Sequence, residues 1–332
     1  MQRAIELAKL GLGYASPNPL VGCVIVHHSK IIGEGYHKTF GEAHAEVNAV
    51  QSVEDKSLLA ESTAYVTLEP CAHHGKTPPC ADMLVSYGVK RVVIGGLDPF
   101  EKVNGEGVRK LREGGVDVVH GILEKECREM NTRFLTSIEQ KRPYVILKWA
   151  QTKNGFLARG NYDSKWISNT KSRQLVHKWR SEEDAILVGF NTAKYDNPSL
   201  TVRDWKGRNP VRVVVDDQLA LSNDLHLYDG SVKTFVLNTQ KDAVSANVIY
   251  IKYDGTVWDL LNRLVASNIQ SLIVEGGTNT LKSFIDTELW DEARVFTSNQ
   301  NFESGIVSPK ISGVVLEDLM IESDRLEILK HS

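Results

Sequence analysis

The sequence has few of the features that accompany secretion, membrane insertion or nucleic-acid binding. Its 332 residues include only four cysteines, too few for a disulfide scaffold, so we expect a reducing, cytoplasmic location. No apolar run approaches the roughly 18 residues of a membrane span, and the charged, amphipathic start is not typical of a secretory signal. The formal net charge of −3 gives no general attraction to nucleic acid. We therefore expect small-molecule partners, with no nucleic acid and no membrane.

The composition is typical of a globular protein, and the length suggests two domains. Apolar residues make up 42% of the chain and charged residues 24%, with no low-complexity tract. A polar stretch at 139–143 divides the chain, so we expect one domain over 1–142 and another over 143–332. On both sides apolar strands alternate with amphipathic helices, which predicts two α/β domains, the first with three layers.

The apolar patterns also predict individual elements. In the first half we expect strands at 21–26, 30–36, 63–68, 90–95 and 116–119, and helices at 4–12, 107–113 and 123–135. In the second half we expect strands at 144–150, 185–189, 211–216, 234–238, 248–251, 271–275 and 293–297. Helices are predicted there at 169–180, with Ser168 as its cap, and at 257–266.

One histidine and two cysteines have the types and order of a catalytic zinc site. His44, Cys71 and Cys80 supply one imidazole and two thiolates. Three protein ligands leave a fourth position for water, which is typical of a catalytic rather than a structural zinc. Glu46 follows His44 by two residues and would be the carboxylate that shuttles protons between the water, the ring nitrogen and the leaving amine.

The spacing constrains the geometry of this site. Residues two apart on a helix do not face each other, so His44 and Glu46 can share a site only beyond the N-terminus of the following helix. A second helix is expected to begin near Cys80, with Thr77 as its cap and Pro78 at its first position. A helix N-terminus favours a thiolate there.

Two buried cysteines and a surface histidine are the alternative interpretation of the same residues. The sequences Pro70-Cys71 and His44-Ala45-Glu46, together with the helix-start signals, favour the metal. Cys23 lies in an apolar strand and Cys127 in a helical stretch, and both are expected to be core or surface residues. The eight-residue spacer between Cys71 and Cys80 differs from the Cys-x-x-Cys of the general deaminase signature.

The second half offers weaker chemical signals. Gly276 and Gly277 follow a predicted strand and precede a helix, where backbone N–H groups can approach a phosphate. The pattern is not the Gly-x-Gly-x-x-Gly of a Rossmann fold. The sequence of this half contains no nucleophile–base pair and no second metal cluster. A reductase needs neither, because the nicotinamide carries the hydride.

Five sequence blocks resemble the bacterial bifunctional riboflavin-biosynthesis deaminase-reductases. The resemblance covers nearly the whole chain, and the cysteine block is its most specific part. The blocks are Pro17-Asn18-Pro19-Leu20-Val21-Gly22, His44-Ala45-Glu46, Thr67-Leu68-Glu69-Pro70-Cys71 through Cys80, Ser164-Lys165-Trp166-Ile167 and Val274-Glu275-Gly276-Gly277.

The resemblance implies a cytidine-deaminase-like domain, followed by a dihydrofolate-reductase-like domain that uses NADPH. The first would deaminate a diaminopyrimidinone ribosyl phosphate, and the second would reduce its ribosyl group to ribityl. Expected deaminase substrate contacts are Asn18, His73, Lys76 and Asp98. Expected cofactor contacts are Ala150, Trp166, Thr192, Asp196, Gly277, Thr278, Asn279, Thr280, Leu281, Lys282 and Ser283. Expected reductase substrate contacts are Ser164, Arg180, Ser199, Arg203 and Glu275, with Arg180 and Arg203 as phosphate clamps. A homo-oligomer, dimer or tetramer, is also implied.

Several alternatives remain open at this level. From spacing alone, Asn18 reads as a turn residue, His73 and Lys76 as solvated loop residues, and the two arginines as surface residues. Phe100 stands where the family usually has Asn, and Asn197 stands where it has Asp. A nucleic-acid base deaminase and a zinc-stabilised structural module are the competing functions. Spacing does not distinguish NADPH from NADH.

Overall fold

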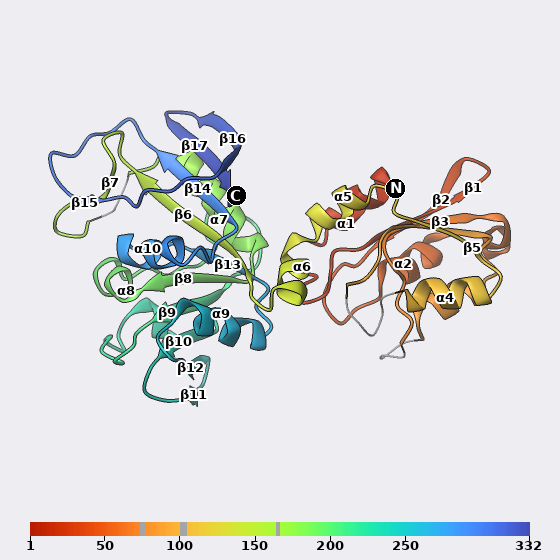
Figure 1. Ribbon diagram of the computed structural model, residues 1–332, viewed down its shortest axis with the longest axis horizontal. Helices are drawn as coiled ribbons and strands as arrows, with labels where there is room; N and C mark the ends of the chain where they lie inside the picture. The colour runs from red at the N-terminus through yellow and green to blue at the C-terminus, as the bar shows by residue number, and fades with distance from the viewer. Residues whose placement is uncertain (74–77, 100–104, 164–166) are drawn as a thin grey trace. The chain divides into compact units, whose positions relative to one another are not determined.

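A computed structural model describes residues 1–73, 78–99, 105–163 and 167–332. It divides into two compact units, Met1–Gln140 and Lys141–Ser332 (Figure 1). This division falls within the polar stretch at 139–143, two residues before the expected boundary. Within the described ranges, no helix combines the length and apolar character that a membrane span requires.

The N-terminal unit is built on a sheet whose strands, among the described residues, follow the order β2-β1-β3-β4-β5. The strands are β1 (Gly22–His27), β2 (Lys30–Tyr36), β3 (Thr63–Leu68), β4 (Arg91–Gly96) and β5 (Asp117–His120). β1 pairs antiparallel with β2 and β3, whereas β3, β4 and β5 run parallel. The carboxyl ends of β3 and β4 therefore lie at one edge, where the residues after them meet.

Helices cover both faces of this sheet and form the three expected layers. The helices are α1 (Gln2–Lys9), α2 (Ala45–Ser52), η1 (Lys56–Glu61), α3 (Cys80–Ser86), α4 (Glu106–Glu113), α5 (Glu124–Met130) and α6 (Thr132–Glu139). Cys23 and Ile25 of β1 pack with α2, α3 and α4, whereas the alternate residue Val24 packs with α1. Successive side chains of β1 therefore point to opposite faces of the sheet, and each face packs against its own layer of helices.

Three local predictions for this unit are wrong. The first helix ends at Lys9 rather than near residue 12. The helix expected at 123–135 is two helices, because Asn131 uses its side chain to pair with both backbone groups of Leu20. Pro78 is not the first helical residue, since α3 begins at Cys80 with Pro79 as its N-cap; Thr77 lies outside the described residues.

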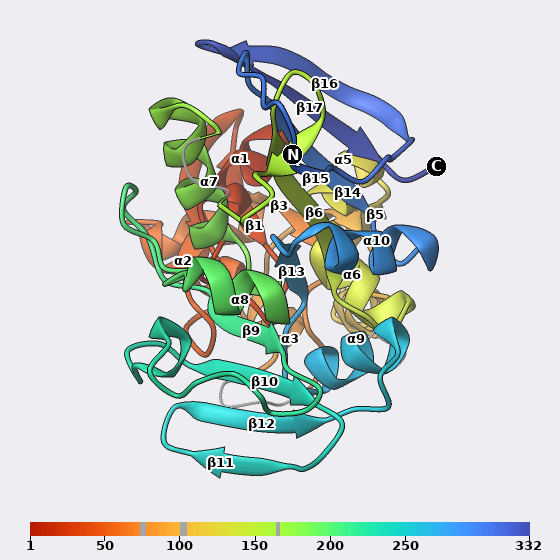
Figure 2. The same cartoon turned by 90° about the vertical axis from the view of Figure 1, so that its left-hand side faces the viewer.

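The C-terminal unit has a larger sheet, whose described strands follow the order β11-β12-β10-β9-β8-β13-β6-β14-β17-β16 (Figure 2). Its strands are β6 (Tyr144–Gln151), β8 (Ala185–Gly189), β9 (Val211–Val215), β10 (Thr234–Asn238), β11 (Ala243–Ser245), β12 (Val248–Lys252), β13 (Ser271–Val274), β14 (Glu292–Thr297), β16 (Val314–Ile321) and β17 (Asp324–Lys330). The strands from β12 to β14 in this order are parallel. β7 (Phe156–Ala158) and β15 (Ile306–Val307) form a separate pair.

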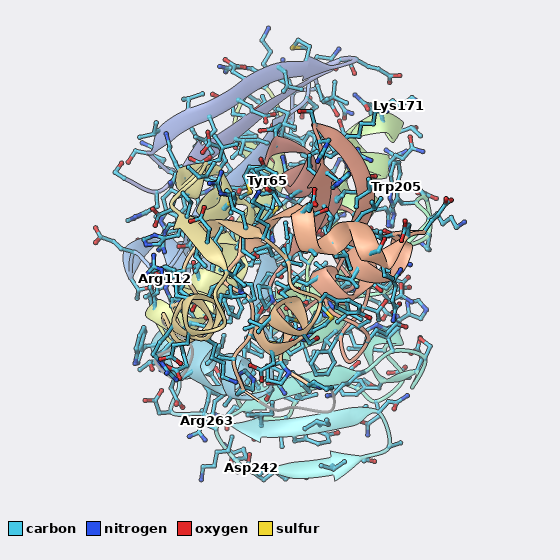
Figure 3. All side chains as sticks on the ribbon, turned by 90° about the vertical axis from the view of Figure 1, so that its right-hand side faces the viewer. Tyr65, Arg112, Lys171, Trp205, Asp242 and Arg263 are labelled. Atoms are coloured by element: carbon cyan, nitrogen blue, oxygen red, sulfur yellow. The ribbon has the colours of Figure 1, made fainter. Side chains whose placement is uncertain are left out.

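Helices again cover both faces. They are α7 (Thr170–Glu182), α8 (Phe190–Asp196), η2 (His226–Tyr228), α9 (Val257–Ala266) and α10 (Thr278–Asp286). One core packs α9 and α10 against Val145 and Leu147 of β6, and the other packs α7 and α8 against Ile146. Lys171 and Asp242 are exposed on this unit (Figure 3), whereas Arg212 is buried.

The predicted elements of this unit are largely present, with one misplaced cap. Asn169, not Ser168, caps α7, because its side chain accepts a hydrogen bond from the N–H of Ser172. The short helix α8 and the β16–β17 hairpin were not predicted. β16 is mostly exposed, so it lacks the apolar–polar alternation of a half-buried strand.

Candidate active sites

His44, Cys71 and Cys80 converge at one point of the N-terminal unit. Their candidate ligand atoms all lie within 4.8 Å of one another. His44 Nδ1 is 3.6 Å from Cys71 Sγ and 3.4 Å from Cys80 Sγ. The backbone N–H of Cys80 also donates to Cys71 Sγ, at 3.3 Å. One imidazole nitrogen and two sulfurs that face a common centre form the donor set of a catalytic zinc site.

Two helix starts and one strand end position these ligands. His44 is the N-cap of α2, and Cys80 is the first residue of α3. Cys71 follows the carboxyl end of β3. The site therefore lies beyond the helix N-termini, as the His-x-Glu spacing requires, and the ends of rigid elements fix the three ligands.

The electrostatics of these side chains favour a thiolate. The pKa of the Cys71 thiol falls to about 4, mainly through hydrogen bonds with the side chains of Cys80 and then His44. The same contact raises the pKa of Cys80, and the hydrogen bond with Cys71 raises the pKa of His44. These three side chains would hold Zn²⁺ with both cysteines as thiolates, because the metal would replace the protons on the two sulfurs.

Glu46 lies beside the ligands in the first turn of α2. Glu46 is only 3% exposed, and its carboxyl group interacts with the side chain of Cys80. Burial is the main cause that raises the pKa of Glu46 to about 7. A carboxyl group whose pKa lies near neutrality can both accept and release a proton, which is what a proton shuttle requires.

Glu69 holds the neighbouring loop against the zinc-site strand. Its carboxylate accepts hydrogen bonds from the N–H groups of Asp98, Gly105 and Val108, at 3.3, 3.0 and 3.1 Å. Val108 lies in the first turn of α4, which has no side-chain cap of its own. Asp98 is thereby held two residues beyond the end of β4, next to the strand that delivers Cys71.

Asn18 is connected to the site through a histidine that the sequence reasoning missed. His37 is 2% exposed, and its Nδ1 lies 3.1 Å from the carbonyl oxygen of Ala43, so that Nδ1 carries the donated proton. Its Nε2 then accepts from Asn18 Nδ2, at 3.1 Å. Burial lowers the pKa of His37, consistent with a neutral ring, and the ring stands edge-on to His44 at 5.6 Å.

The C-terminal unit has a cavity of about 370 Å³ at the carboxyl ends of β6, β8 and β13. In open parallel sheets, ligands bind beyond these ends of the strands. The expected residues that line the cavity are Ala150, Arg180, Thr192, Asp196, Arg203, Glu275 and Gly277. Residues from five separate segments thus meet in one cavity.

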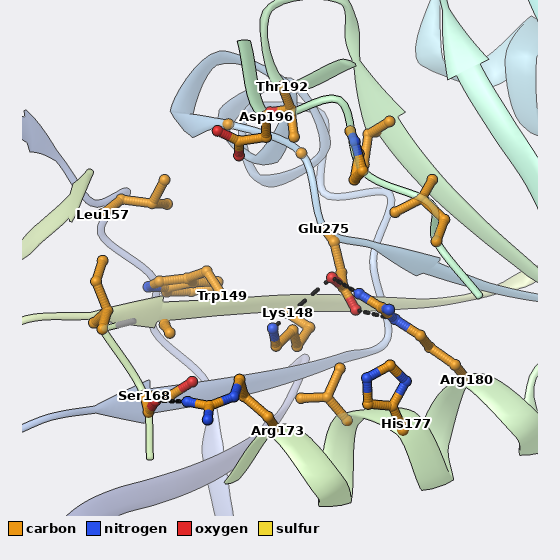
Figure 4. Close-up of a pocket in the computed structure, with 18 of the residues that line it drawn as sticks. Lys148, Trp149, Leu157, Ser168, Arg173, His177, Arg180, Thr192, Asp196 and Glu275 are labelled. Carbon is orange, nitrogen blue, oxygen red and sulfur yellow. Dashed lines mark hydrogen bonds and ion pairs between the residues drawn. The ribbon is translucent and has the colours of Figure 1, made fainter. Parts of the chain in front are cut away.

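Three charged side chains are paired inside this cavity (Figure 4). Arg180 donates through Nε and Nη2 to the two carboxylate oxygens of Glu275, at 3.2 and 2.8 Å. Lys148 Nζ lies 3.9 Å from Glu275 Oε2. The three side chains are only 11–14% exposed. Two cations against one anion leave a net positive site that suits an anionic or electron-rich ligand.

Burial and charge act in opposite directions on this cluster. Burial lowers the pKa of Lys148, partly offset by Glu275. The pKa of Glu275 falls to about 2, because Arg180 and Lys148 outweigh the cost of its burial. Glu275 is therefore firmly ionised, and Lys148 releases its proton more readily than an exposed lysine.

Comparison with known proteins assigns the family. Residues 1–96 match the cytidine and deoxycytidylate deaminase zinc-binding region, and residues 143–298 match the RibD C-terminal domain. A riboflavin biosynthesis protein RibD from Actinobacillus pleuropneumoniae is 40% identical over 94% of this chain and 84% of its own length. The chain belongs to the RibD family.

Solved structures agree with this family over both units. A diaminohydroxyphosphoribosylaminopyrimidine deaminase/5-amino-6-(5-phosphoribosylamino)uracil reductase from Thermotoga maritima is 40% identical, with a TM-score of 0.91, covering 100% of this chain and 97% of that one. RibD from Acinetobacter baumannii is 31% identical, with a TM-score of 0.91 and the same coverage. The protein is thus a bifunctional riboflavin-pathway enzyme with a Zn²⁺-dependent deaminase and an NADPH-dependent reductase, on the two expected folds.

The described residues fit the NADPH of the RibD family. A second cavity, of about 460 Å³, is lined by Asn279, Thr280 and Ser283. Both cavities border the segments 188–192 and 276–280, and the uncapped N-terminus of α10 lies there. Gly276 is required by close approach, because a Cβ would lie 2.6 Å from Thr280 Cβ. A helix N-terminus between two cavities suits the phosphates of a dinucleotide.

Some expected contacts lie elsewhere. Leu281 is buried in the core, and its N–H donates to Gly277 O, so it packs the helix rather than facing a ligand. Lys282 is exposed, and Thr278 donates its hydroxyl hydrogen bond to Val307 O. Ser199 is half-buried between two cavity-lining residues.

Four further positions that the sequence analysis named lie outside the described residues, and one expected contact is exposed. Lys76, Phe100, Ser164 and Trp166 are not described by the structure. His73 is exposed two residues after Cys71.

The sequence reasoning missed Lys148, Arg173 and His177 in the reductase cavity. A lysine in the otherwise apolar stretch 144–150 was the available signal for the first of these. Burial lowers the pKa of His177, and the nearby Arg180 lowers it further. Its position on α7, facing the cavity, has no sequence signal beyond the helical pattern.

Proposed function

We propose that the N-terminal unit removes an amino group from 2,5-diamino-6-(5-phosphoribosylamino)pyrimidin-4(3H)-one. The C-terminal unit then reduces the ribosyl group of 5-amino-6-(5-phosphoribosylamino)uracil to ribityl. The observation that carries this proposal is the pairing on one chain of a His-Cys-Cys centre, beside a buried carboxyl, with a cationic cavity at the reductase sheet edge. The Thermotoga relative has both named activities.

In the deaminase, His44, Cys71 and Cys80 would hold Zn²⁺, which supplies an activated water at neutral pH. Glu46 would take a proton from that water and pass it to the ring nitrogen, and then deliver a proton to the leaving amine. The ring carbon gains oxygen and loses nitrogen, and the products are the uracil and ammonia. Asn18 and Asp98, held by His37 and Glu69, would bind the pyrimidine. His73, with Lys76, would meet the ribosyl phosphate.

In the reductase, NADPH supplies the hydride when it is bound. Reduction adds that hydride to C1′ of the opened ribosyl group and a proton to the nitrogen attached to C1′. We assign the proton to Lys148, because it is a buried cation inside the cavity with a lowered pKa. Glu275 would orient Lys148 and the substrate. Arg180 is already paired with both carboxylate oxygens of Glu275, so we propose that it holds this carboxylate in place. This role differs from the phosphate clamp that we expected from the sequence.

The remaining expected residues divide between the two ligands. Arg203 is exposed and lines the cavity, where two nitrogens of its guanidinium can bind a phosphate. Ser199, which lies between the cavity-lining Pro198 and Leu200, would contact the same substrate. Ser164 lies outside the described residues, and its substrate contact rests on the family resemblance alone. Ala150, Thr192, Asp196 and the turn at Gly277 would contact the cofactor, as would Trp166. Asn279, Thr280 and Ser283 would contact its far end in the second cavity.

Two half-reactions on the purified full chain test the proposal. With the diaminopyrimidinone phosphate alone, we expect one ammonia per substrate and no NADPH oxidation. With the uracil phosphate and NADPH, we expect one NADPH oxidised per substrate and no ammonia. Ammonia release from tRNA or single-stranded DNA, with none from the pyrimidine phosphate, would favour a nucleic-acid deaminase instead.

We also propose a homo-oligomer, formed through the edge strand β16. Val314, Val315, Leu316 and Met320 of this strand are 54–61% exposed. A long apolar edge strand invites pairing with another chain, and symmetric dimers are the common outcome.

The four cysteines are unpaired, which supports a reducing, cytoplasmic setting.

Leu316→Glu tests this surface. Leu316 is the extra residue at a β-bulge between β16 and β17, so its replacement leaves the hairpin register intact. We expect the mass measured by light scattering to fall from that of the oligomer to that of the 37.0 kDa chain. Val244→Glu, at an exposed apolar position in β11 on the opposite edge, should keep the oligomer. An unchanged mass for Leu316→Glu would contradict the proposed interface.

A further inference from the structure

A second cluster of possible metal ligands lies away from the zinc site of the N-terminal unit, at the turn between β1 and β2. His27 ends β1, His28 begins the turn, and Glu61 ends the short helix η1. His28 Nε2 is 3.4 Å from Glu61 Oε2, and His27 Nε2 is 4.0 Å from the same oxygen. One atom from each of the three residues lies within 4.8 Å of the other two.

The backbone explains why two consecutive histidines face the same side. Successive side chains of a strand point to opposite faces. His28 and Ser29, however, have left-handed backbones, with φ of 43° and 65°. This turn brings the ring of His28 back over that of His27, and the rings stack at 4.1 Å with an interplanar angle of 20°. A positive φ is uncommon for residues other than glycine, so the stacking of these two rings depends on the backbone conformation of this turn.

The strand pairing brings the carboxylate to the same place. β1 and β3 are antiparallel, and Val26 is opposite Thr63. Glu61 precedes Thr63 by two residues, so it lies next to the end of β1 that carries the histidines. The catalytic ligand Cys71 instead follows the other end of β3. The six residues of β3 separate the two ends by about 20 Å.

We propose that His27, His28 and Glu61 form a second binding site for a divalent transition-metal ion of the Zn²⁺ class. Imidazole and carboxylate are ligands that Zn²⁺ accepts, at bond lengths of about 2.1 Å. In a tetrahedral site such bonds place ligand atoms roughly 3.4 Å apart. The His28–Glu61 distance already matches. His27 Nε2 lies farther away, at 4.0 Å from the same oxygen, and its ring must turn out of the stack with His28 to bind the same ion. Water completes the coordination at this exposed surface.

The site should bind its ion more weakly than the thiolate site. The side chains of His28 and Glu61 are 70% and 69% exposed, so binding must order two mobile groups. Neither residue contributes a thiolate. The second ion is therefore expected to exchange readily, while the ion at Cys71 and Cys80 is retained.

Titration of the metal-free full chain with Co²⁺ distinguishes the two sites. Thiolate ligands give Co²⁺ an intense near-ultraviolet charge-transfer band, and imidazole–carboxylate ligands do not. We expect two equivalents to bind, the first with this band and the second without it. His28→Ala should lose the second equivalent and keep the first, whereas His120→Ala, which removes another exposed histidine of the same unit, should keep both.

Cys80→Ser separates this proposal from the deaminase assignment, because it should weaken the thiolate site and leave the second equivalent bound. The Zn²⁺-loaded His28→Ala enzyme should retain the wild-type deaminase rate at one equivalent of zinc. A wild-type chain that binds a single equivalent, or a second equivalent that His28→Ala binds as tightly as wild type, would overturn the second site.

Discussion

Glu46→Gln is expected to lower the deaminase kcat by about 10²- to 10⁴-fold, the usual contribution of a positioned proton-transfer group. This corresponds to about 3 to 5 kcal/mol of activation free energy. Glutamine keeps the shape of the side chain but can neither accept nor release the proton that glutamate exchanges with water and substrate. Because His44, Cys71 and Cys80 are untouched, zinc content should remain at the wild-type level.

The second active site supplies an internal control for this variant. NADPH oxidation with the uracil phosphate should be unchanged, since Glu46 lies in the other compact unit. Glu42→Gln is the matched control, because it removes an exposed carboxylate two residues before His44 and should retain nearly full deaminase activity. A Glu46→Gln enzyme with bound zinc and wild-type ammonia release would show that another group moves the proton.

Lys148→Met is expected to lower the reductase kcat/KM by about 100-fold or more, the lower range for loss of a general acid. Methionine fills a similar volume but provides neither a positive charge nor a proton. The pH profile gives a second readout. Burial lowers the pKa of Lys148, so the wild-type rate should fall on the alkaline side at a pH below the ordinary lysine value, and this limb should be absent in the variant.

This substitution should not destabilise the protein through loss of charge. Because burial lowers the pKa, the folded state holds the lysine proton less tightly than the unfolded chain does. The buried charge therefore costs stability below the lowered pKa, and this cost disappears as the pH rises from the lowered to the ordinary pKa. The Arg180–Glu275 pair remains intact in the variant, so no carboxylate is left unpaired.

Lys153→Met provides the comparison for Lys148→Met, since Lys153 is exposed just beyond the end of the same strand. It should leave both activities at the wild-type level. Deamination should also persist in Lys148→Met. If Lys148→Met reduced the uracil phosphate at the wild-type rate, the proton would have to come from another group in the cavity.

The parts that the sequence predicted best have strong local signals. Apolar runs bounded by turns placed β3, β8 and β10 at their observed residues, and Thr256 caps α9 where the helical pattern begins. The candidate zinc ligands His44, Cys71 and Cys80 could be predicted because a catalytic zinc needs nitrogen and sulfur ligands. Few other sites in proteins combine one histidine and two cysteines with a nearby glutamate. The strict two-residue spacing of His44 and Glu46 even predicted that the site lies beyond a helix start.

The parts that were missed depend on contacts between distant residues. Asn131 interrupts the predicted helix because it bonds to Leu20, and no local pattern encodes that contact. Arg180 was interpreted as a phosphate clamp because its partner Glu275 is 95 residues away in sequence. Glu69 was part of a recognised block, but its role in holding Asp98 depends on the adjacent strand.

X-ray absorption at the zinc edge of the enzyme loaded with one equivalent of zinc tests the central claim most directly. The account predicts two sulfur ligands at about 2.3 Å and two nitrogen or oxygen ligands at about 2.0–2.1 Å, one of them exchangeable. Addition of a pyrimidine that mimics the hydrated ring should change only the exchangeable ligand. A site with four protein ligands, or with fewer than two sulfurs, would contradict the deaminase centre described above.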